Sequence, residues 1–542
     1  MLTDQSGLSP FERLLTLFTR VRPGEGRSTF LFFLHGFLLL FSYYIVRVLR
    51  EAFILTDFSA EVRSYGYAVV ALVLMFVVPA YGAVRKRIDG ERLLQAVTVF
   101  FAVNMLFFSA TAYYGISMSF TFFVWVSIFG AMMIAQFWAF AADTFNLKSG
   151  QRLFPVIMVG ANLGALAGGK FASVAAAALH PVGLMMVATL VLAATVVLAR
   201  PARAATPDGS RAVSPEHGTA PAKLLGGIEL VLRDRYLLLV ALFIVLLNWI
   251  NTTGGFLLSD MVVRDADARV AASAGTLAKE VAITAFYGDY NFWITLVGLA
   301  IQLLFVARVY RWVGIRGALL VLPVIAALGY GLMAFVPIFS IIRLVKIGED
   351  SVNNSLMNTT RHALFLPVDR DAKYEGKTAI DTFFWRVGDL IQAGVVYVGL
   401  HWLDWTTAHF ALLNFALAVV WIGLAYIIGR EFRALAQRNA FNVAPEVGQP
   451  IPDLHYAPGQ PFRHFVPADA FRDADPGDVL NLSARLADGQ PLPRWVQFDA
   501  RQRTFLGKCP DGYCEEVTIE VVASDVDGSE VASLFVMRRT LR

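Results

Sequence analysis

The sequence predicts an all-α polytopic membrane protein, with twelve transmembrane helices in two six-helix halves, followed by a C-terminal all-β sandwich. Of its 542 residues, 57% are hydrophobic and 16% are charged, and the mean hydropathy is +0.58. Soluble domains carry about 25% charged residues, so much of this chain must contact lipid. The net charge of +4 is small and its basic residues lie in loops, so we expect no nucleic-acid partner.

Long segments without charge define the predicted helices, because a membrane-crossing helix needs about 20 apolar residues. Leu93–Ala142 contains no Asp, Glu, Lys or Arg, and its length requires two helices that turn near Tyr114 and Gly115. The predicted helices are 30–54, 64–84, 93–114, 118–142, 154–177, 181–199, 236–258, 286–307, 317–336, 340–364, 379–402 and 406–429.

Changes of composition divide the chain into segments. The predicted segments are a cytoplasmic N-terminal tail 1–29, a six-helix bundle 30–199, a cytoplasmic linker 200–235, a second six-helix bundle 236–430, a linker 431–454 and a β-sandwich 455–542. The first linker is rich in Pro, Ser and Gly and is expected to be flexible. We also expect a long loop at 259–285.

The distribution of Lys and Arg predicts the orientation. Alternate loops carry 25 of these residues on one side of the membrane and 4, including Arg63, on the other. Basic loops stay in the cytoplasm, so we expect a bacterial inner-membrane protein with both termini in the cytoplasm. Cys509 and Cys514 would stay reduced there, and two cysteines alone make neither a disulfide framework nor a zinc site.

A short pattern repeats in the two halves. Arg87-x-x-Gly90-x-Arg92 recurs 224 residues later as Arg311-x-x-Gly314-x-Arg316, and the same offset carries Gly164 to Gly388. Two related six-helix halves are typical of the major facilitator architecture, in which the substrate site lies between the halves near the middle of the membrane.

Charged residues inside the predicted helices are the candidate site, because they are costly in lipid and usually line a pathway or pair with each other. The predicted substrate-binding residues are Arg47, Arg50, Glu51, Lys170, Arg343, Lys346, Asp350, Asp381, Arg386 and Asp389. Arg47 and Glu51 share a helix face. One interpretation is an ion-pair lattice that locks or gates the halves. The other is an anionic substrate, because guanidinium groups suit phosphate or carboxylate.

No sequence pattern indicates catalysis, a metal or a cofactor, so the chain is not expected to be an enzyme. Gly164-x-x-x-x-Gly169-Lys170 imitates a phosphate-binding loop, but Phe171 replaces the required Ser or Thr and the segment is an apolar helix. The small residues there are better explained by close helix packing.

The first predicted helix ends in Phe41-Ser42-Tyr43-Tyr44-x-x-Arg47-x-x-Arg50-Glu51, which resembles the signature of the ATP:ADP antiporter family. Phe137–Asp143 and Ile380–Asp389 are similar to later helices of that family. The likeness covers about residues 30–430, although Val48 and Glu51 stand where the family often has proline and aspartate. The resemblance implies a major facilitator fold and an anionic, nucleotide-like solute.

The C-terminal segment has alternating patterns such as Val517–Val522, separated by Asp-Gly and Pro turns, which predict an all-β sandwich. Gly459–Phe462 and Phe471–Asp478 resemble a cadherin-like, immunoglobulin-type domain. The resemblance implies a protein or carbohydrate ligand and a place outside the cytoplasm, whereas the loop charges, which we favour, place the domain in the cytoplasm. Calcium is the less favoured interpretation of five acidic residues, namely Asp473, Asp475, Asp478, Asp525 and Asp527.

The sequence therefore predicts a transporter that exchanges or imports a nucleotide or a similar phosphorylated anion. Its expected partners are that solute, the lipid bilayer and a ligand of the β-sandwich, with no cofactor. Two alternatives stay open. The first is a membrane scaffold or sensor that acts through the β-sandwich, and the second is a transporter of an unrelated organic anion or lipid.

Overall fold

The structure is a computed structural model that describes residues 22–85, 90–207, 224–273, 276–336, 338–368, 372–441, 445–473, 480–510, 516–525 and 529–540. It divides into two compact units. The helical unit comprises Met1–Leu364 and Glu375–Gly429, and the C-terminal unit comprises Phe365–Tyr374 and Arg430–Arg542.

Among the described residues, the first half of the helical unit contains α2 (Glu25–Asp57), α3 (Ala60–Arg85), α4 (Gly90–Tyr113), α5 (Ser119–Thr144) and α6 (Leu147–Ala204). The chain of α6 reverses at His180, whose φ is 53° and ψ is 167°. A residue that precedes proline, here Pro181, is disfavoured in the helical region. The two arms of α6 therefore correspond to the predicted helices 154–177 and 181–199.

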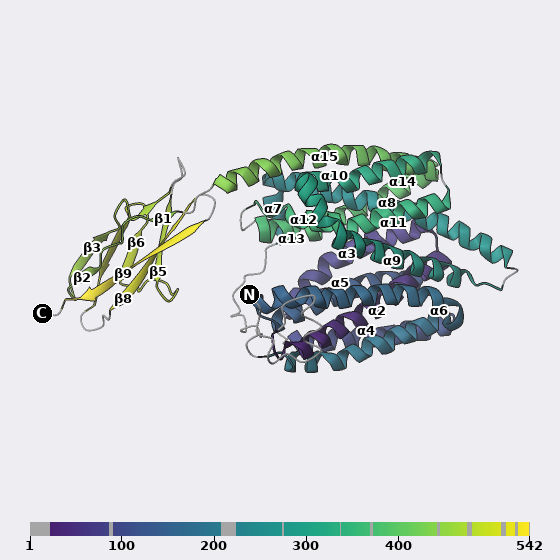
Figure 1. Cartoon of the computed structure of the whole chain (residues 1–542), viewed down its shortest axis with the longest axis horizontal. Coiled ribbons are helices and arrows are strands. Elements are labelled where there is room, and N and C mark those ends of the chain that lie inside the picture. The colour runs from purple at the N-terminus through teal and green to yellow at the C-terminus, as the bar shows by residue number, and fades with distance from the viewer. Residues whose placement is uncertain are drawn as a thin grey trace. The chain divides into compact units, whose positions relative to one another are not determined.

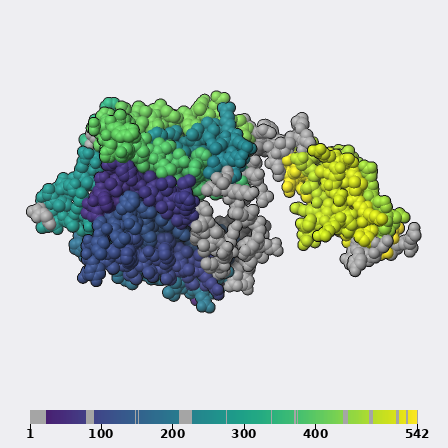
Figure 2. Space-filling view, turned by 180° about the vertical axis from the view of Figure 1, so that it is seen from behind, coloured from purple at the N-terminus to yellow at the C-terminus, as the bar shows by residue number. Residues whose placement is uncertain are grey.

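The second half contains α7 (Leu224–Arg233), α8 (Arg235–Ala272), α9 (Lys279–Leu304), α10 (Val306–Phe335), α11 (Phe339–Val352), η2 (Asn353–Met357), α12 (Asn358–Ala363), η3 (Ala372–Gly376), α13 (Lys377–Ala379), η4 (Ile380–Phe384), α14 (Trp385–His401) and α15 (Thr407–Phe441). The η segments are π-helical turns. Figure 1 shows α2, α4, α5 and α6 together, and α8, α10 and α14 together. Figure 2 shows the two halves as adjacent blocks, purple to blue and teal to green.

Three segments that the sequence predicts as a loop or a linker contain helices or a strand. The 259–285 segment is mostly helical, because α8 continues to Ala272 and is supported by the i,i+4 ion pairs Asp260–Arg264 and Asp265–Arg269. The 200–235 linker contains α7. The 431–454 linker contains the polar end of α15 and also strand β1, which pairs with β4 and so belongs to the β domain.

The helical unit is that of a multi-pass membrane protein. Among the described residues, eight helices are long and apolar enough to cross a membrane, with both arms of α6 inside one of these eight. The helix α11 is not among them, because it has only 14 residues before the π-helical turn η2 begins. The count of twelve spans stays a prediction.

Close packing of α2 on α6 depends on small residues. A Cβ added at Gly160, Gly164 or Gly168 would overlap the backbone of Phe33, Phe37 or Phe41 respectively. Gly164, the first glycine of the segment that imitates a phosphate-binding loop, is therefore one of three glycines that let α2 and α6 approach each other closely.

The C-terminal unit contains a β domain of nine strands among the described residues: β1 (Glu446–Val447), β2 (Leu454–Tyr456), β3 (Pro461–Phe465), β4 (Phe471–Arg472), β5 (Asn481–Leu486), β6 (Val496–Asp499), β7 (Thr504–Lys508), β8 (Val517–Ser524) and β9 (Glu530–Arg539). The strands form sheets β2-β9-β8-β5, β3-β7-β6 and β1-β4, and only β2 and β9 pair in parallel. Phe505, Ile519 and Phe535 are central to its buried core.

The expectation of reduced cysteines is wrong for Cys509, which forms a disulfide. Cys514, the sequence's other cysteine, lies outside the described residues, as do Asp475, Asp478 and Asp527 of the calcium interpretation. Asp525 accepts a hydrogen bond from the Ser529 amide at 2.8 Å. In the part of the chain that the structure describes, no three His, Cys, Asp or Glu side chains could hold a metal together.

We expect His464 to make the β domain sensitive to acid. Its ring lies 5.0 Å from that of Phe535, and its Nε2 has no hydrogen-bond partner among the described residues. Burial lowers the pKa of the His464 imidazole, although Pro452 and Asp453 act in the opposite direction. Its contribution to stability is therefore complete above the unfolded pKa of about 6.5 and is lost as the pH falls below it.

We expect the amide hydrogens of β3 and β9 in the full chain to exchange faster at about pH 5.5 than at about pH 7.5, after correction for the intrinsic rate. Hydrogen-exchange mass spectrometry measures this difference. His464→Leu should remove it. An equal pH dependence in the variant would show that His464 is not its source.

Candidate functional site

A cavity of about 220 Å³ lies between the two halves of the helical unit. Its lining residues come from α2, α3, α8, α9, α11 and α14: Arg47, Arg50, Glu51, Arg63, Tyr67, Asn248, Asn251, Thr252, Gly255, Leu258, Tyr287, Tyr290, Asn291, Lys346, Asp350, Trp385, Arg386 and Asp389. Seven of the ten predicted site residues are in this set. The other three are Lys170, Arg343 and Asp381.

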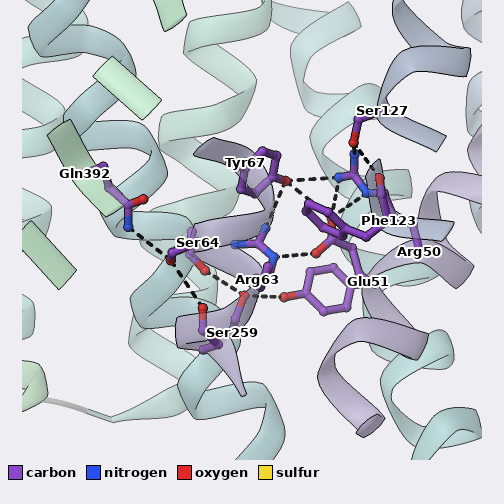
Figure 3. A network of polar contacts seen from close by, with 12 residues as sticks. Arg50, Glu51, Arg63, Ser64, Tyr67, Phe123, Ser127, Ser259 and Gln392 are labelled. Carbon is purple, nitrogen blue, oxygen red and sulfur yellow. Dashed lines mark hydrogen bonds and ion pairs between the residues drawn. The ribbon is translucent and has the colours of Figure 1, made fainter. Parts of the chain in front are cut away.

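The first-half wall consists of Arg47, Arg50, Glu51 and Arg63. Glu51 is buried and accepts hydrogen bonds from Arg50 and from Arg63 Nε, the latter at 2.5 Å (Figure 3). Arg50 also donates to the hydroxyls of Ser127 and Tyr67, each at 3.0 Å. One carboxylate therefore compensates two buried guanidinium groups.

Arg47 is the cation of this wall without an anionic partner. Its guanidinium lies 5.3 Å from the centre of the Tyr44 ring, and among the described residues it makes no ion pair or hydrogen bond. Although Arg47 and Glu51 share a helix face, the Glu51 carboxylate pairs with Arg50 and Arg63. The first-half wall therefore has three cations and one anion.

Arg63 belongs to the site although the sequence predicts it in an outer loop. The side chain is 9% exposed and reaches Glu51 from the first turn of α3. One signal could have found it. Glu51 lies on the same helix as two arginines, and Arg63 is the nearest cation after the short turn between α2 and α3.

The second-half wall consists of Lys346, Asp350, Arg386 and Asp389, and its charges are paired. Lys346 Nζ lies 3.1 Å from Asp350 Oδ1, and Arg386 Nη1 lies 3.3 Å from Asp389 Oδ2. Asn248 donates to the other oxygen of Asp389 at 2.7 Å. Among the charged side chains that line the cavity, cations thus exceed anions on the first-half wall and equal them on the second-half wall.

The remaining predicted residues lie elsewhere. Lys170 of α6 and Arg343 of α11 both contact Asp289 of α9, at 3.0 and 2.5 Å. We name these three residues the Asp289 bridge. Asp381 lies 3.7 Å from Arg361 within the second half.

Further polar contacts join the halves near one end of the helical bundle, where α2 ends and α3 begins. We name this the α2–α3 end. Gln392 of α14 donates to Ser64 of α3 at 3.2 Å, and His401 lies 2.6 Å from Glu61. Asp57 and Ser119, hydrogen-bonded at 2.5 Å, place the start of α5 at the same end. The contacts described here hold the halves together on that side of the cavity.

Asp289→Asn should loosen the α2–α3 end. The side chains of the Asp289 bridge are 25–47% exposed, so each ion pair contributes about 0.2–1 kcal/mol. A cysteine introduced at Thr252, in the cavity, should react roughly two- to fivefold faster with a membrane-impermeant maleimide added on that side. Cys509 and Cys514 are first replaced by serine. An unchanged rate would mean that the bridge does not hold the halves closed.

Comparisons with known proteins agree with this architecture. A family model described as "Putative Ig domain" matches residues 444–540. ADP,ATP carrier protein 1 of Chlamydia pneumoniae is 24% identical over 381 residues, covering 61% of this chain and 70% of the relative. The same carrier of Chlamydia muridarum is 28% identical over 177 residues, and the match spans 28% of this chain and a third (33%) of that relative.

The resemblance to the ATP:ADP antiporter family is confirmed. A nucleoside transporter structure is 13% identical with a TM-score of 0.52, covering 75% of this chain and 99% of that chain. A POT family transporter in complex with 5-aminolevulinic acid is 14% identical with a TM-score of 0.54, covering 76% and 96%. These structures establish the major facilitator type of fold alone. The protein is thus a membrane transporter, and its relatives are carriers rather than enzymes.

Proposed function

We propose that this protein transports a nucleotide, or a similar phosphorylated anion, by alternating access, as an exchanger or an importer. The observation that supports this most directly is the first-half wall, where three guanidinium groups face the cavity with one carboxylate. Planar guanidinium groups bind phosphate oxygens in pairs. The similarity to ADP,ATP carrier proteins favours a nucleotide among such anions.

The uneven charge of the cavity suggests how a nucleotide would bind. Its phosphates would lie against the first-half wall, where Arg47 lacks an anionic partner among the described residues. The nucleoside would lie against the second half, where Asn251 and Asn291 can hydrogen-bond to base and sugar and Trp385 also lines the cavity. A substrate with both parts uses both sides of the cavity.

Alternating access accounts for the size of the cavity. Small-molecule sites usually have volumes of about 300–1,000 Å³, so a cavity of about 220 Å³ must widen to admit a nucleotide. The contacts at the α2–α3 end would part for access from one side. By the loop charges we propose that this is the periplasmic side.

Counterflow in proteoliposomes tests the proposal. Vesicles containing the purified full chain are loaded with unlabelled ADP, and uptake of labelled ADP is measured against ATP, AMP, adenosine and pyrophosphate as competitors. We expect exchange that ADP and ATP inhibit and that adenosine does not. Transport of an unrelated organic anion without nucleotide exchange, or no flux of any of these solutes, would contradict the proposal.

A further inference from the structure

A buried cluster in the second half contains more carboxylates than cations. Lys346, Glu349 and Asp350 follow one another on α11, and Lys346 Nζ lies 3.0 Å from Glu349 Oε2 and 3.1 Å from Asp350 Oδ1. The side chains are 1%, 4% and 21% exposed. Two carboxylates therefore share a single ammonium group away from bulk water.

Among the described residues, the remaining neighbours of the cluster contribute hydrogen bonds but no second cation at hydrogen-bond distance. Tyr330 of α10 donates to Glu349 at 2.8 Å, and Tyr290 of α9 donates to Asp350 at 2.6 Å. Asn251 of α8 accepts from Lys346 at 3.0 Å. The charged and titratable groups of α9 and α10 nearest to the cluster are Asp289, Tyr287, Tyr290 and Tyr330, and α11 itself adds Arg343.

The glycine at position 254 leaves space for the side chains of this cluster. A Cβ on Gly254 of α8 would overlap the Tyr330 hydroxyl and lie 3.0 Å from Lys346 Nζ. Asn414 of α15 is completely buried, and its amide donates to the Ile250 carbonyl, which the Tyr330 hydroxyl also reaches. Its Oδ1 accepts no hydrogen bond from the described residues. In the described part of the chain, Asn414 Oδ1 thus lacks a hydrogen-bond donor, and it lies near the Glu349 and Asp350 carboxylates, which also outnumber their cation.

We infer that Glu349 and Asp350, which share Lys346, bind one proton that crosses the membrane together with the anionic solute. This inference rests on the proposed function, since it concerns the same cavity. An uncompensated carboxylate in a low-dielectric site is costly, and binding a proton removes that cost. Asp350 lines the cavity, so a hydronium ion there can protonate the pair and leave water behind.

The proton and the anion would favour each other's binding. Without a bound proton, the two carboxylates and the Lys346 ammonium group have a net charge of −1. This charge repels an anion in the cavity. One proton brings the cluster to neutrality. By linkage, a proton that strengthens anion binding is itself bound more tightly when the anion is present. Above the pH at which the pair titrates, the apparent affinity for the anion should fall by up to about tenfold for each pH unit, the limit being reached when only the protonated form binds the anion.

The experiment measures uptake of labelled ADP into proteoliposomes at several external pH values. It compares the wild type, Glu349→Gln, Asp350→Asn and the control Asp265→Asn, whose carboxylate pairs with Arg269 outside the cavity. In the wild type and the control, affinity should fall with rising pH, and an inward acid gradient should drive ADP accumulation. In Glu349→Gln and Asp350→Asn, the affinity should change less than about twofold per pH unit, because either change removes the excess charge.

Glu349→Asp keeps the carboxylate and should retain the pH dependence, which provides a readout if a neutral variant does not fold. A wild type that exchanges ADP with an affinity independent of pH would overturn the inference and leave the proposed function standing. Equal pH dependence in the neutral variants would also overturn it.

If the wild type exchanges no ADP at all, the proposed function fails and infrared spectroscopy decides the inference separately. Spectra of the lipid-embedded protein at low minus high pH should contain a carboxylic-acid C=O band that is lost in Glu349→Gln or Asp350→Asn. The same band in both variants, or no such band in the wild type, would rule out a proton on this pair.

Discussion

Glu51→Gln should destabilise the first half of the helical unit by about 3–5 kcal/mol. Glu51 is the single carboxylate beside the buried guanidinium groups of Arg50 and Arg63, whose side chains are 8% and 9% exposed. Glutamine keeps the shape of the side chain but removes its charge, so two buried cations lose their compensation. The cost of an unpaired buried charge exceeds the value of the pair itself.

Thermal unfolding of the purified protein in detergent measures this loss. Glu91→Gln is the matched control, because Glu91 lies in the same half and its ion pair with Arg203 is longer, at 3.8 Å, and more exposed. The control should change stability by at most about 1 kcal/mol. Equal effects of the two substitutions would mean that Glu51 does not have the special electrostatic role assigned to it.

Arg47→Lys should weaken ADP binding about tenfold, and Arg47→Met about 100-fold, with near-normal insertion into the membrane. Lysine keeps the charge but loses the planar pair of donors, and methionine loses both. Stability should change little, because Arg47 has no ionic partner among the described residues to leave uncompensated.

The affinity is measured from the concentration dependence of ADP counterflow. Arg264→Lys is the control, since Arg264 pairs with Asp260 at the exposed end of α8. Unchanged affinity in both Arg47 variants would move the phosphate site away from the first-half wall. A loss of folding without loss of affinity in the surviving protein would assign Arg47 a structural role.

The sequence was sufficient for those features that depend on local composition. Segments without charged residues predicted the apolar helices. Short runs of alternating hydrophobic and polar residues predicted the β domain. The signature at the end of α2 pointed to Arg47, Arg50 and Glu51, which the structure brings into one cavity. Helical spacing also related Lys346 to Asp350, because residues four apart share a face.

The errors came from contacts between distant segments, which spacing does not encode. In the sequence, Arg63 is an ordinary basic residue of a predicted loop. In the structure, α3 folds back beside α2 and brings the Arg63 side chain to Glu51. Lys170 and Arg343 resembled the cavity cations in sequence, but Asp289, which we had not singled out, draws both of them to the Asp289 bridge. The helical part of 259–285 was missed because polar sequence was taken to mean a loop, although i,i+4 ion pairs support a helix in water.

The Asp289 bridge has a kinetic consequence. Asp289 and Arg343 belong to the same half, so separation of the halves breaks only the contact with Lys170. When the α2–α3 end opens, the ammonium group of Lys170, which Asp289 had neutralised, becomes exposed at the cavity entrance. A positive mouth concentrates anions and speeds their encounter with the site, and salt screens this effect. The rate at which an anion arrives from the α2–α3 end should therefore fall as ionic strength rises, even where its equilibrium affinity changes little.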